Sequence, residues 1–280
     1  TPTKGPVTPS SVPSRSRSNP MPLDIFPVAA FNDNYIWLIC DAQRRQAAIV
    51  DPGDAAPVLA ALRAQDIEPI AVLITHHHGD HVGGVSALKQ RFPRLPVYGP
   101  AGERIPGITD RLADGDRVSL PEIGAEFEVL DVPGHTAGHI AYYGHGALFC
   151  GDTLFVGGCG RVFDGTHEQL ADSLQRLAAL PGETRVYCAH EYTLDNYGFG
   201  KWVEPDNAVL VAREEEALAR RHDGQPTVPS TLADERATNP FMRLGETAVI
   251  EAAEKRAGHP LKTAREVFYV IRQWKDREYD

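Results

Sequence analysis

Cysteine is scarce in this chain of 280 residues: Cys40, Cys150, Cys159 and Cys188 are the four present, and no two of them form a CxxC pair. A disulfide scaffold of this size, or a zinc site built from thiolates, needs more cysteines at closer spacing. Long hydrophobic runs are also missing, because none approaches the ~18 residues of a membrane span. The sequence therefore predicts reduced thiols in a cytoplasmic protein that does not bind a membrane.

Positive charge is in deficit as well. The chain has 28 Lys and Arg against 38 Asp and Glu, which gives a formal net charge of −10. A general binder of phosphate backbones needs a basic face, so nucleic acid is excluded as a partner. A small anionic ligand remains compatible with this charge, because a local basic pocket can occur on an acidic protein.

The first residues differ in composition from the rest. Residues 1–20 contain five Pro and five Ser but no acidic residue, and they have too few apolar side chains to bury. We expect a disordered tail, which is open to three readings: a native extension, a targeting segment or a vector-derived segment before a natural start at Met21. Over the whole chain, hydrophobic residues at 42% and charged residues at 24% are typical of a globular protein, and the length suits one large domain or two modest ones.

Residues 21–191 alternate between short apolar, β-rich runs and helical patterns. A second segment, residues 192–280, shows helical periodicity and no strand pattern, so an α+β domain at 21–191 followed by a helical domain at 192–280 is predicted. The expected strands are 26–31, 35–40, 46–51, 70–75, 96–99, 125–132, 139–144, 147–152 and 184–190. The expected helices are 54–64, 85–92, 167–180, 207–221, 246–258 and 261–279.

The sharpest motif is THHHGDH at residues 75–81, directly after the apolar run 70–74. Loops that leave strand ends are where α/β folds place functional groups. His76 and His78 can point to one side, while Asp80 and His81 turn to another. Imidazole and carboxylate ligands suit zinc, iron or manganese, so the motif predicts two half-sites for metal ions.

Four local residues cannot complete two metal sites, because a catalytic zinc takes about three protein ligands and a water. Three further strand ends each offer one ligand: His135 in PGHT, Asp152 in GDT and His190 in AHE. Asp152 has two oxygens and is the candidate to bridge two cations. Taken by itself, each of these positions is weak evidence for a metal ligand. Their occurrence in one chain with the motif at residues 75–81 strengthens the prediction for all three.

These motifs, in this order, resemble the metallo-β-lactamase superfamily. The chain is more narrowly similar to the glyoxalase II (hydroxyacylglutathione hydrolase) family, from about residue 23 to the C-terminus. The similar stretches are FNDNYIWLI (31–39), PGHTAGHI (133–140), GDTLFVGGCGRVFDGT (151–166), YCAHEYTLDN (187–196), TVPSTLADERATNPFMR (227–243) and IRQWKD (271–276).

The resemblance implies an αβ/βα sandwich at 21–191 and a helical, glutathione-binding domain at 192–280. It implies two divalent metal ions, one held by His76, His78 and His135, the other by Asp80, His81 and His190. Asp152 would bridge them, and Asp80 and Asp152 would be catalytic. Zinc is the expected metal, with iron or manganese as alternatives.

The family pattern also suggests substrate contacts. Arg272 and Lys275 would meet the glycine carboxylate of glutathione, and Arg161 and Tyr192 would contact the tripeptide near the metals. Phe163 stands where human-type members have tyrosine, so one hydroxyl contact is missing. Taken without the resemblance, Arg272 and Lys275 fit equally well as a solvated helix face.

The implied reaction is hydrolysis of S-(2-hydroxyacyl)glutathione, such as S-lactoylglutathione, by a hydroxide held between two metals. The products would be glutathione and a 2-hydroxy acid such as lactate. This reaction is the second step of methylglyoxal detoxification, and we expect the enzyme to be a monomer. The alternatives are a one-iron sulfur dioxygenase of the same superfamily, a β-lactamase or lactonase, and a non-catalytic metal-binding module. The similarity over the C-terminal helices and the full set of seven ligands favour the hydrolase.

Overall fold

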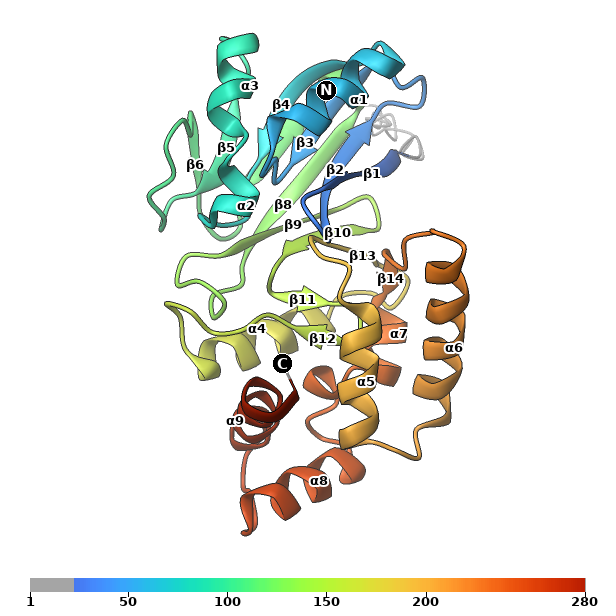
Figure 1. Ribbon diagram of the computed structural model, residues 1–280. Helices are drawn as coiled ribbons and strands as arrows, with labels where there is room; N and C mark the ends of the chain where they lie inside the picture. Colours follow the sequence, from blue (N-terminus) through green and yellow to red (C-terminus); the bar gives the residue numbers. More distant parts are fainter. Residues whose placement is uncertain (1–22, 280) are drawn as a thin grey trace, which may run out of the picture.

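The computed structural model describes residues 23–279, so the predicted disordered tail lies outside the described residues. Two six-stranded sheets pack against each other in the upper part of Figure 1. The first sheet has the order β1-β2-β3-β4-β5-β6. Its strands are β1 (Asp24–Ala30), β2 (Asn34–Cys40), β3 (Gln46–Val50), β4 (Glu68–Leu73), β5 (Val97–Pro100) and β6 (Asp110–Leu112).

The second sheet has the order β14-β13-β10-β9-β8-β7. Its strands are β7 (Arg117–Leu120), β8 (Ala125–Asp131), β9 (Ile140–Gly144), β10 (Ala147–Gly151), β13 (Arg185–Cys188) and β14 (Ser230–Thr231). A small antiparallel hairpin of β11 (Leu154–Phe155) and β12 (Gly158–Cys159) follows β10. Most of the expected strands are confirmed, while β6, β7, β11, β12 and β14 are too short for a clear apolar pattern.

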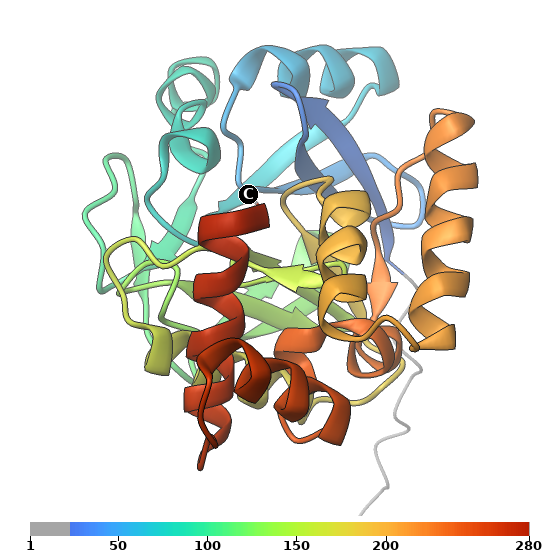
Figure 2. The same ribbon diagram turned by 60° about the horizontal axis from the view of Figure 1, so that its bottom comes forward.

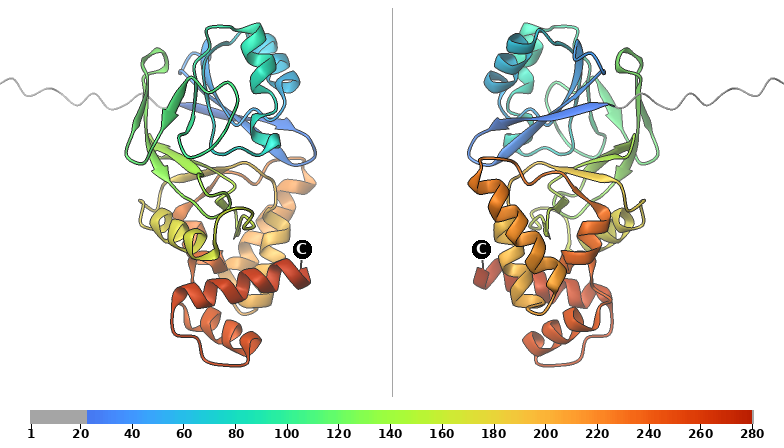
Figure 3. Two further views of the ribbon diagram at one scale, coloured as in Figure 1. Left: turned by 90° about the vertical axis from the view of Figure 1, so that its left-hand side faces the viewer. Right: turned by 90° about the vertical axis from the view of Figure 1, so that its right-hand side faces the viewer.

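Alternation along β2 separates two hydrophobic layers, because successive strand residues point to opposite faces. Tyr35 and Trp37 belong to the cluster that fills the space between the sheets and continues into the C-terminal helices. Ile36 and Leu38 join a second cluster on the outer face, which Val58 and the rest of α1 (Ala55–Gln65) and α3 (Val85–Arg91) cover. In Figure 3, α4 (His167–Ala178) lies on the side opposite these helices. This is the layering of an αβ/βα sandwich.

The remaining helices gather at one end of the sandwich (Figure 3). They are α5 (Thr193–Val203), α6 (Ala208–His222), α7 (Leu232–Thr238), α8 (Thr247–Ala257) and α9 (Ala264–Trp274), with the short helical turns η2 (Pro240–Met242) and η3 (Lys275–Tyr279). Outside this group, the short helix α2 (Gly79–Val82) follows β4, and the turn η1 (Pro121–Ile123) lies between β7 and β8. The expectation that no strand occurs after residue 192 is wrong in one detail. β14 leaves the helical segment and pairs with β13, since Val186 is opposite Ser230.

Helix α9 connects the helical end to the strand ends. Thr263 and Glu266 form a capping box at its start, because the side chain of each accepts a hydrogen bond from the backbone N–H of the other. Figure 2 shows α9 running from the far end of the helical segment back toward the sheets, which brings Arg272 and Lys275 near the loops after β8, β10 and β13. Within residues 23–279 no helix has the length and apolar character to cross a membrane.

Candidate metal centre and substrate cavity

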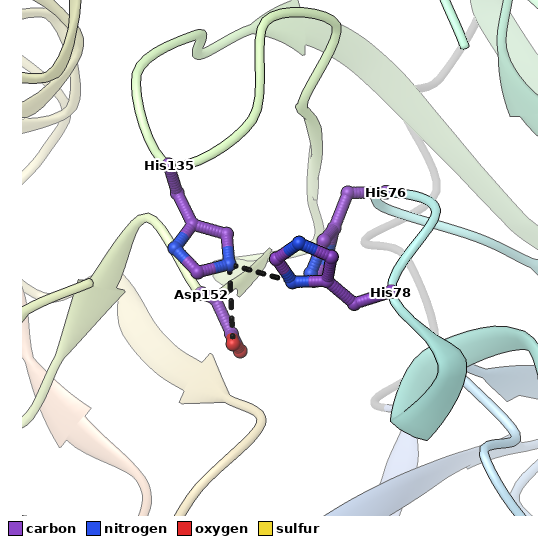
Figure 4. Close-up of side chains that lie close together, drawn as sticks. All are labelled: His76, His78, His135 and Asp152. Carbon is purple, nitrogen blue, oxygen red and sulfur yellow. Dashed lines mark hydrogen bonds and ion pairs between the residues drawn. The ribbon is translucent and has the colours of Figure 1, made fainter. Parts of the chain in front are cut away.

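The seven predicted metal ligands come together in two groups at the ends of β4, β8, β10 and β13. Within each group the ligand atoms lie within 4.8 Å of one another. Figure 4 shows the first group converging from three separate loops, and the second group adjoins it. The first group consists of His76, His78, His135 and Asp152, and the second of Asp80, His81 and His190.

Asp152 faces both groups. Its Oδ1 lies 3.3 Å from Nε2 of His81 and 3.4 Å from Nε2 of His190. Its Oδ2 lies 3.5 Å from Nε2 of His135, the contact drawn in Figure 4. His135 Nε2 is also 3.0 Å from Nδ1 of His78. One carboxylate therefore directs an oxygen toward each ligand group, which is the arrangement that a bridging ligand needs.

Four of the histidines are held at Nδ1, so that Nε2 points into the centre. A hydrogen bond to the outer ring nitrogen fixes the tautomer and the orientation of a metal-binding imidazole. The Nδ1 partners are Thr75 Oγ1 for His76 (3.0 Å), Asp51 Oδ2 for His81 (3.0 Å), the Arg161 carbonyl for His135 (2.7 Å) and Asp33 Oδ1 for His190 (2.7 Å).

Three of the ligand atoms are buried and have no hydrogen-bond partner. Nε2 of His76, Nε2 of His81 and Oδ1 of Asp152 make no hydrogen bond, although each atom is shielded from solvent. Leaving such an atom unpaired costs roughly 1–3 kcal/mol. Three unpaired ligand atoms that face one another fit a divalent cation with nitrogen and oxygen ligands.

The charges of the centre lead to the same conclusion. Burial disfavours the ionised form of Asp152, but the neighbouring His81 and His190 hold its pKa well below the usual range. Burial also disfavours the charged form of His190. The neighbouring carboxylates of Asp152 and Asp80 have the larger effect, and they raise the pKa of His190 to about 10. Burial and the adjacent His81 lower the pKa of His76 well below its usual value. The carboxylates thus require positive charge, which bound cations would supply.

Sequence reasoning missed several residues that support the ligands. Asp51 accepts hydrogen bonds from the backbone N–H (2.8 Å) and hydroxyl (2.7 Å) of Thr75 as well as from His81. Asn34 Nδ2 donates to Oδ2 of Asp80 at 3.0 Å. The sequence signal for Asp33 and Asn34 is the stretch 31–39, which is similar to the glyoxalase II family. For Asp51 the signal is its position directly after the strand β3, because the ligands also follow strands.

Two histidines outside the predicted ligand set have supporting contacts. His139 is fully buried, its ring stacks on His76 with 4.5 Å between centroids, and its Nε2 accepts from the backbone N–H of Asp152 at 3.2 Å. His77 Nδ1 lies 3.0 Å from Oε2 of Glu103. Neither side chain belongs to the two ligand groups.

A cavity of about 500 Å³ opens beside the ligands, and all five predicted substrate residues line it. Tyr192 stacks on the ring of His190 (4.7 Å, 8°), and Phe163, which is 64% exposed, packs edge-on against His78 and His135. Asp195 and Asn196 also line the cavity, and the sequence reasoning did not single them out. The complete predicted set is Arg161, Phe163, Tyr192, Arg272 and Lys275.

The solvated-face interpretation of Arg272 and Lys275 is wrong. Arg272 is 1% exposed and Lys275 6%. The guanidinium of Arg272 donates to the carbonyl of Cys159 (3.0 Å) and pairs with Asp276 (2.8 Å), and it lies over the ring of Phe241. Arg272 and Lys275 therefore form the basic end of a cavity whose other end is the ligand centre.

Comparison with known proteins places both halves of the chain. The model of the metallo-beta-lactamase superfamily matches residues 30–190, and that of the hydroxyacylglutathione hydrolase C-terminus matches residues 191–278. Among solved structures, ETHE1 from Myxococcus xanthus superposes with a TM-score of 0.60 at 28% identity, covering 88% of each chain. The protein TTHA1623 in a di-iron-bound form superposes with a TM-score of 0.55 at 29% identity, covering 77% of this chain and 99% of that one.

The fold and the paired ligand groups thus define a member of the metallo-β-lactamase superfamily, as the resemblance predicts. Curated relatives narrow the assignment. Hydroxyacylglutathione hydrolase from Nitrosomonas europaea is 54% identical over 91% of this chain and 96% of its own, and the enzyme of that name from Alkalilimnicola ehrlichii is 56% identical over 91% and 99%. The chain belongs to the hydroxyacylglutathione hydrolase (glyoxalase II) family and is a thioester hydrolase.

Proposed function

We propose that this enzyme hydrolyses S-(2-hydroxyacyl)glutathione, with S-lactoylglutathione as the representative substrate, at the centre formed by the seven ligands. The observation that carries the proposal is the single cavity that joins this centre to Arg272 and Lys275. A glutathione thioester has a carboxylate at its glycine end and a reactive carbonyl at its sulfur. The cavity offers cations for the first and metal ligands for the second.

The first metal would be held by His76, His78 and His135, and the second by Asp80, His81 and His190, with Asp152 shared. Their atoms already face one another within each group, which supports the assignment. Nitrogen and oxygen ligands without thiolate suit zinc, which we propose as the native metal, and they also accept iron or manganese. When bound, a pair of such cations lowers the pKa of a water molecule toward ~7 and stabilises an oxyanion.

The side chains divide the remaining work. Asp80, which Asn34 orients at 3.0 Å, accepts a hydrogen bond from the attacking water and directs it toward the thioester carbonyl. Phe163 and Tyr192 flank the histidines and limit water around the acyl group. The departing glutathione thiolate needs little help from an acid, because it is a good leaving group. The products are glutathione, a 2-hydroxy acid such as lactate, and a proton.

The tripeptide would lie along the cavity. We assign its glycine carboxylate to Arg272 and Lys275, and its central part to Arg161 and Tyr192. Charge complementarity supports this orientation, since three of these four side chains are cationic and all line the same cavity. We further propose a domain boundary near residue 191, a monomer, and a cytoplasmic location, the last supported by four free, buried cysteines.

One experiment tests the proposal. The purified protein is assayed for loss of the thioester absorbance of S-lactoylglutathione, and its metal content is measured on the same sample. We expect turnover with about two metal ions per chain, and the loss of both in Asp152→Ala. The double variant Arg272→Ala with Lys275→Ala should retain metal but show a raised KM. Full activity in Asp152→Ala would overturn the bridging role, and an unchanged KM in the double variant would overturn the assignment of the glycine carboxylate.

A further inference from the structure

The β11–β12 hairpin brings backbone groups to both ends of the cavity. It starts two residues after Asp152 and ends just before the loop of Arg161. The carbonyl of Arg161 accepts from Nδ1 of His135 at 2.7 Å, and the carbonyl of Cys159 accepts from the guanidinium of Arg272 at 3.0 Å. A shift of this hairpin would therefore move the metal ligand His135 and the substrate-binding Arg272 together.

The tip of the hairpin is held by side chains from the C-terminal helices. Asn196 on α5 donates to one carbonyl at 3.0 Å. Glu235 on α7 accepts a hydrogen bond from a backbone N–H of the tip at 2.8 Å. Asn239, at the end of α7, donates to two backbone carbonyls at 3.3 and 2.9 Å. The backbone groups they bind are the carbonyls of Val156, Phe155 and Gly158 and the N–H of Gly157.

These three side chains are almost fully excluded from solvent. Asn196 is 2% exposed, and Glu235 and Asn239 are 0% exposed. Asn239 Nδ2 also donates to Oε2 of Glu235 at 3.0 Å, and Ser230 Oγ donates to Oε1 at 2.6 Å. A buried carboxylate is costly unless its hydrogen bonds are satisfied, and this one is satisfied through both oxygens.

The glycines at the tip show how closely the helices approach it. Gly157 has φ +71°, and a Cβ there would lie 2.6 Å from the ring of Tyr197. A Cβ on Gly158 would lie 2.5 Å from Asn196. These two glycines permit close packing and give the hairpin no room to shift.

We propose that Glu235 and Asn239 are positioning residues of the hydrolase: by holding the tip of the β11–β12 hairpin, they set the Arg161 carbonyl on His135 and the Cys159 carbonyl on Arg272. Their side chains form hydrogen bonds with the hairpin, with Ser230, with the N–H of Phe241 and with each other. They act through the hairpin, and they make the helical segment part of the metal centre as well as of the glutathione site. The inference rests on the proposed thioester hydrolase activity.

The test compares Glu235→Gln with Ser230→Ala at pH 8. Glu235→Gln keeps the shape but removes the negative charge. If its carbonyl oxygen takes the place of Oε2, the hydrogen bonds from Gly157 and Asn239 lose their charge assistance, and if its N–H₂ group does, both bonds are lost. Ser230→Ala removes a buried hydrogen bond from the same carboxylate on the side away from the hairpin. Three quantities are measured: KM and kcat for S-lactoylglutathione, the Kd of the thioether S-hexylglutathione, and zinc retained against a chelator.

We expect Glu235→Gln to raise KM and the Kd of S-hexylglutathione by on the order of tenfold and to release zinc more readily, because small displacements of positioned groups are costly. Ser230→Ala should lose thermal stability but keep all three quantities within about twofold of wild type. If Glu235→Gln matches wild type in KM, Kd and zinc retention once folded, its role is structural and the proposal is overturned. The same holds if Ser230→Ala shifts KM as much.

Asn239→Ala serves as the second variant if Glu235→Gln does not fold, with the same expectation. The wild-type control separates this proposal from the proposed function. A wild-type protein that binds S-hexylglutathione and zinc but does not hydrolyse the thioester would contradict the substrate assignment, while the comparison of Kd and zinc retention between variants would still decide the positioning role.

Discussion

Oδ2 of Asp51 lies 3.0 Å from Nδ1 of His81 and 2.7 Å from Oγ1 of Thr75, so one buried carboxylate braces the loop that supplies four of the seven ligands. In a third hydrogen bond, the backbone N–H of Thr75 donates to Oδ1 of Asp51 at 2.8 Å, which holds the start of the loop where it leaves β4. Asp51 itself lies in the left-handed region at φ +51°, a strained conformation that its hydrogen bonds maintain.

The first prediction concerns this brace. Asp51→Asn replaces one carboxylate oxygen with an N–H₂ group, which cannot accept, so the side chain cannot keep all three hydrogen bonds from His81 and Thr75. Losing such an outer partner costs roughly 10–100-fold in metal affinity. Competition with a chromogenic chelator measures it. Asp54→Asn is the matched control, because Asp54 lies three residues on and only caps α1 through the N–H of Ala56; equal zinc affinity of the two variants would contradict the prediction.

A second prediction concerns Glu103, which is 6% exposed and joins two ligand loops. It accepts a hydrogen bond from Thr136 Oγ1, beside His135, and lies 3.0 Å from Nδ1 of His77, between the other two ligands of that group. Glu103→Gln should lower both kcat and zinc affinity, by about tenfold for the metal. The control is Glu122→Gln, an exposed position on η1. Unchanged zinc affinity in Glu103→Gln would show that the two loops keep their places without this link.

The third prediction tests the departure at Phe163. Its exposed ring leans on His78 and His135 but has no hydroxyl group for the tripeptide. Phe163→Tyr adds one hydrogen bond, worth about 0.5–1.5 kcal/mol, so KM for S-lactoylglutathione should fall about 2–10-fold at similar kcat. Phe31→Tyr is the control, since Phe31 is 60% exposed and is not among the residues lining the cavity. A KM that stays the same in Phe163→Tyr would place the tripeptide away from this ring.

The ligand positions could be read from the sequence because each comes directly after a short apolar strand, where local pattern and chemistry coincide. His135, Asp152 and His190 illustrate this, and the structure brings all three to the loop 76–81. Their supporting partners are not distinguished in this way. Asp51 also follows an apolar strand, β3, but nothing in the sequence pairs it with His81 and Thr75, and Glu103 has no distinctive neighbours. Both roles depend on how β3 and the loop after β5 are placed in space.

The helical segment shows the same limit at the level of elements. Helices α6, α8 and α9 follow clear periodicity and are confirmed, with ends within about three residues except where α9 gives way to η3. Helix α5 was missed because Gly198 and Gly200 interrupt its pattern; Gly198 packs against Tyr279 and Gly200 against Leu210, so tertiary contacts override propensity. The short α7 carries the buried Glu235, and no local pattern distinguishes a buried glutamate from an exposed one.

The last prediction follows from that burial. Burial raises the pKa of Glu235 to about 7 from its ordinary 4.5, although hydrogen bonds from Ser230, Gly157 and Asn239 partly oppose the shift. The folded protein therefore binds a proton that the unfolded chain has released between these two values. The stability this proton contributes is fully present below about pH 4.5 and is lost as pH rises through 7, a difference of about 3 kcal/mol. Glu235→Gln has no such group, so wild type should lose stability relative to the variant between pH 5 and pH 8.

Urea unfolding of both proteins in EDTA, which keeps metal release out of the comparison, measures the difference at each pH. If the two unfolding free energies change in parallel across this range, Glu235 is not held in its protonated form, and the cost of its charge in the interior is smaller than its burial indicates.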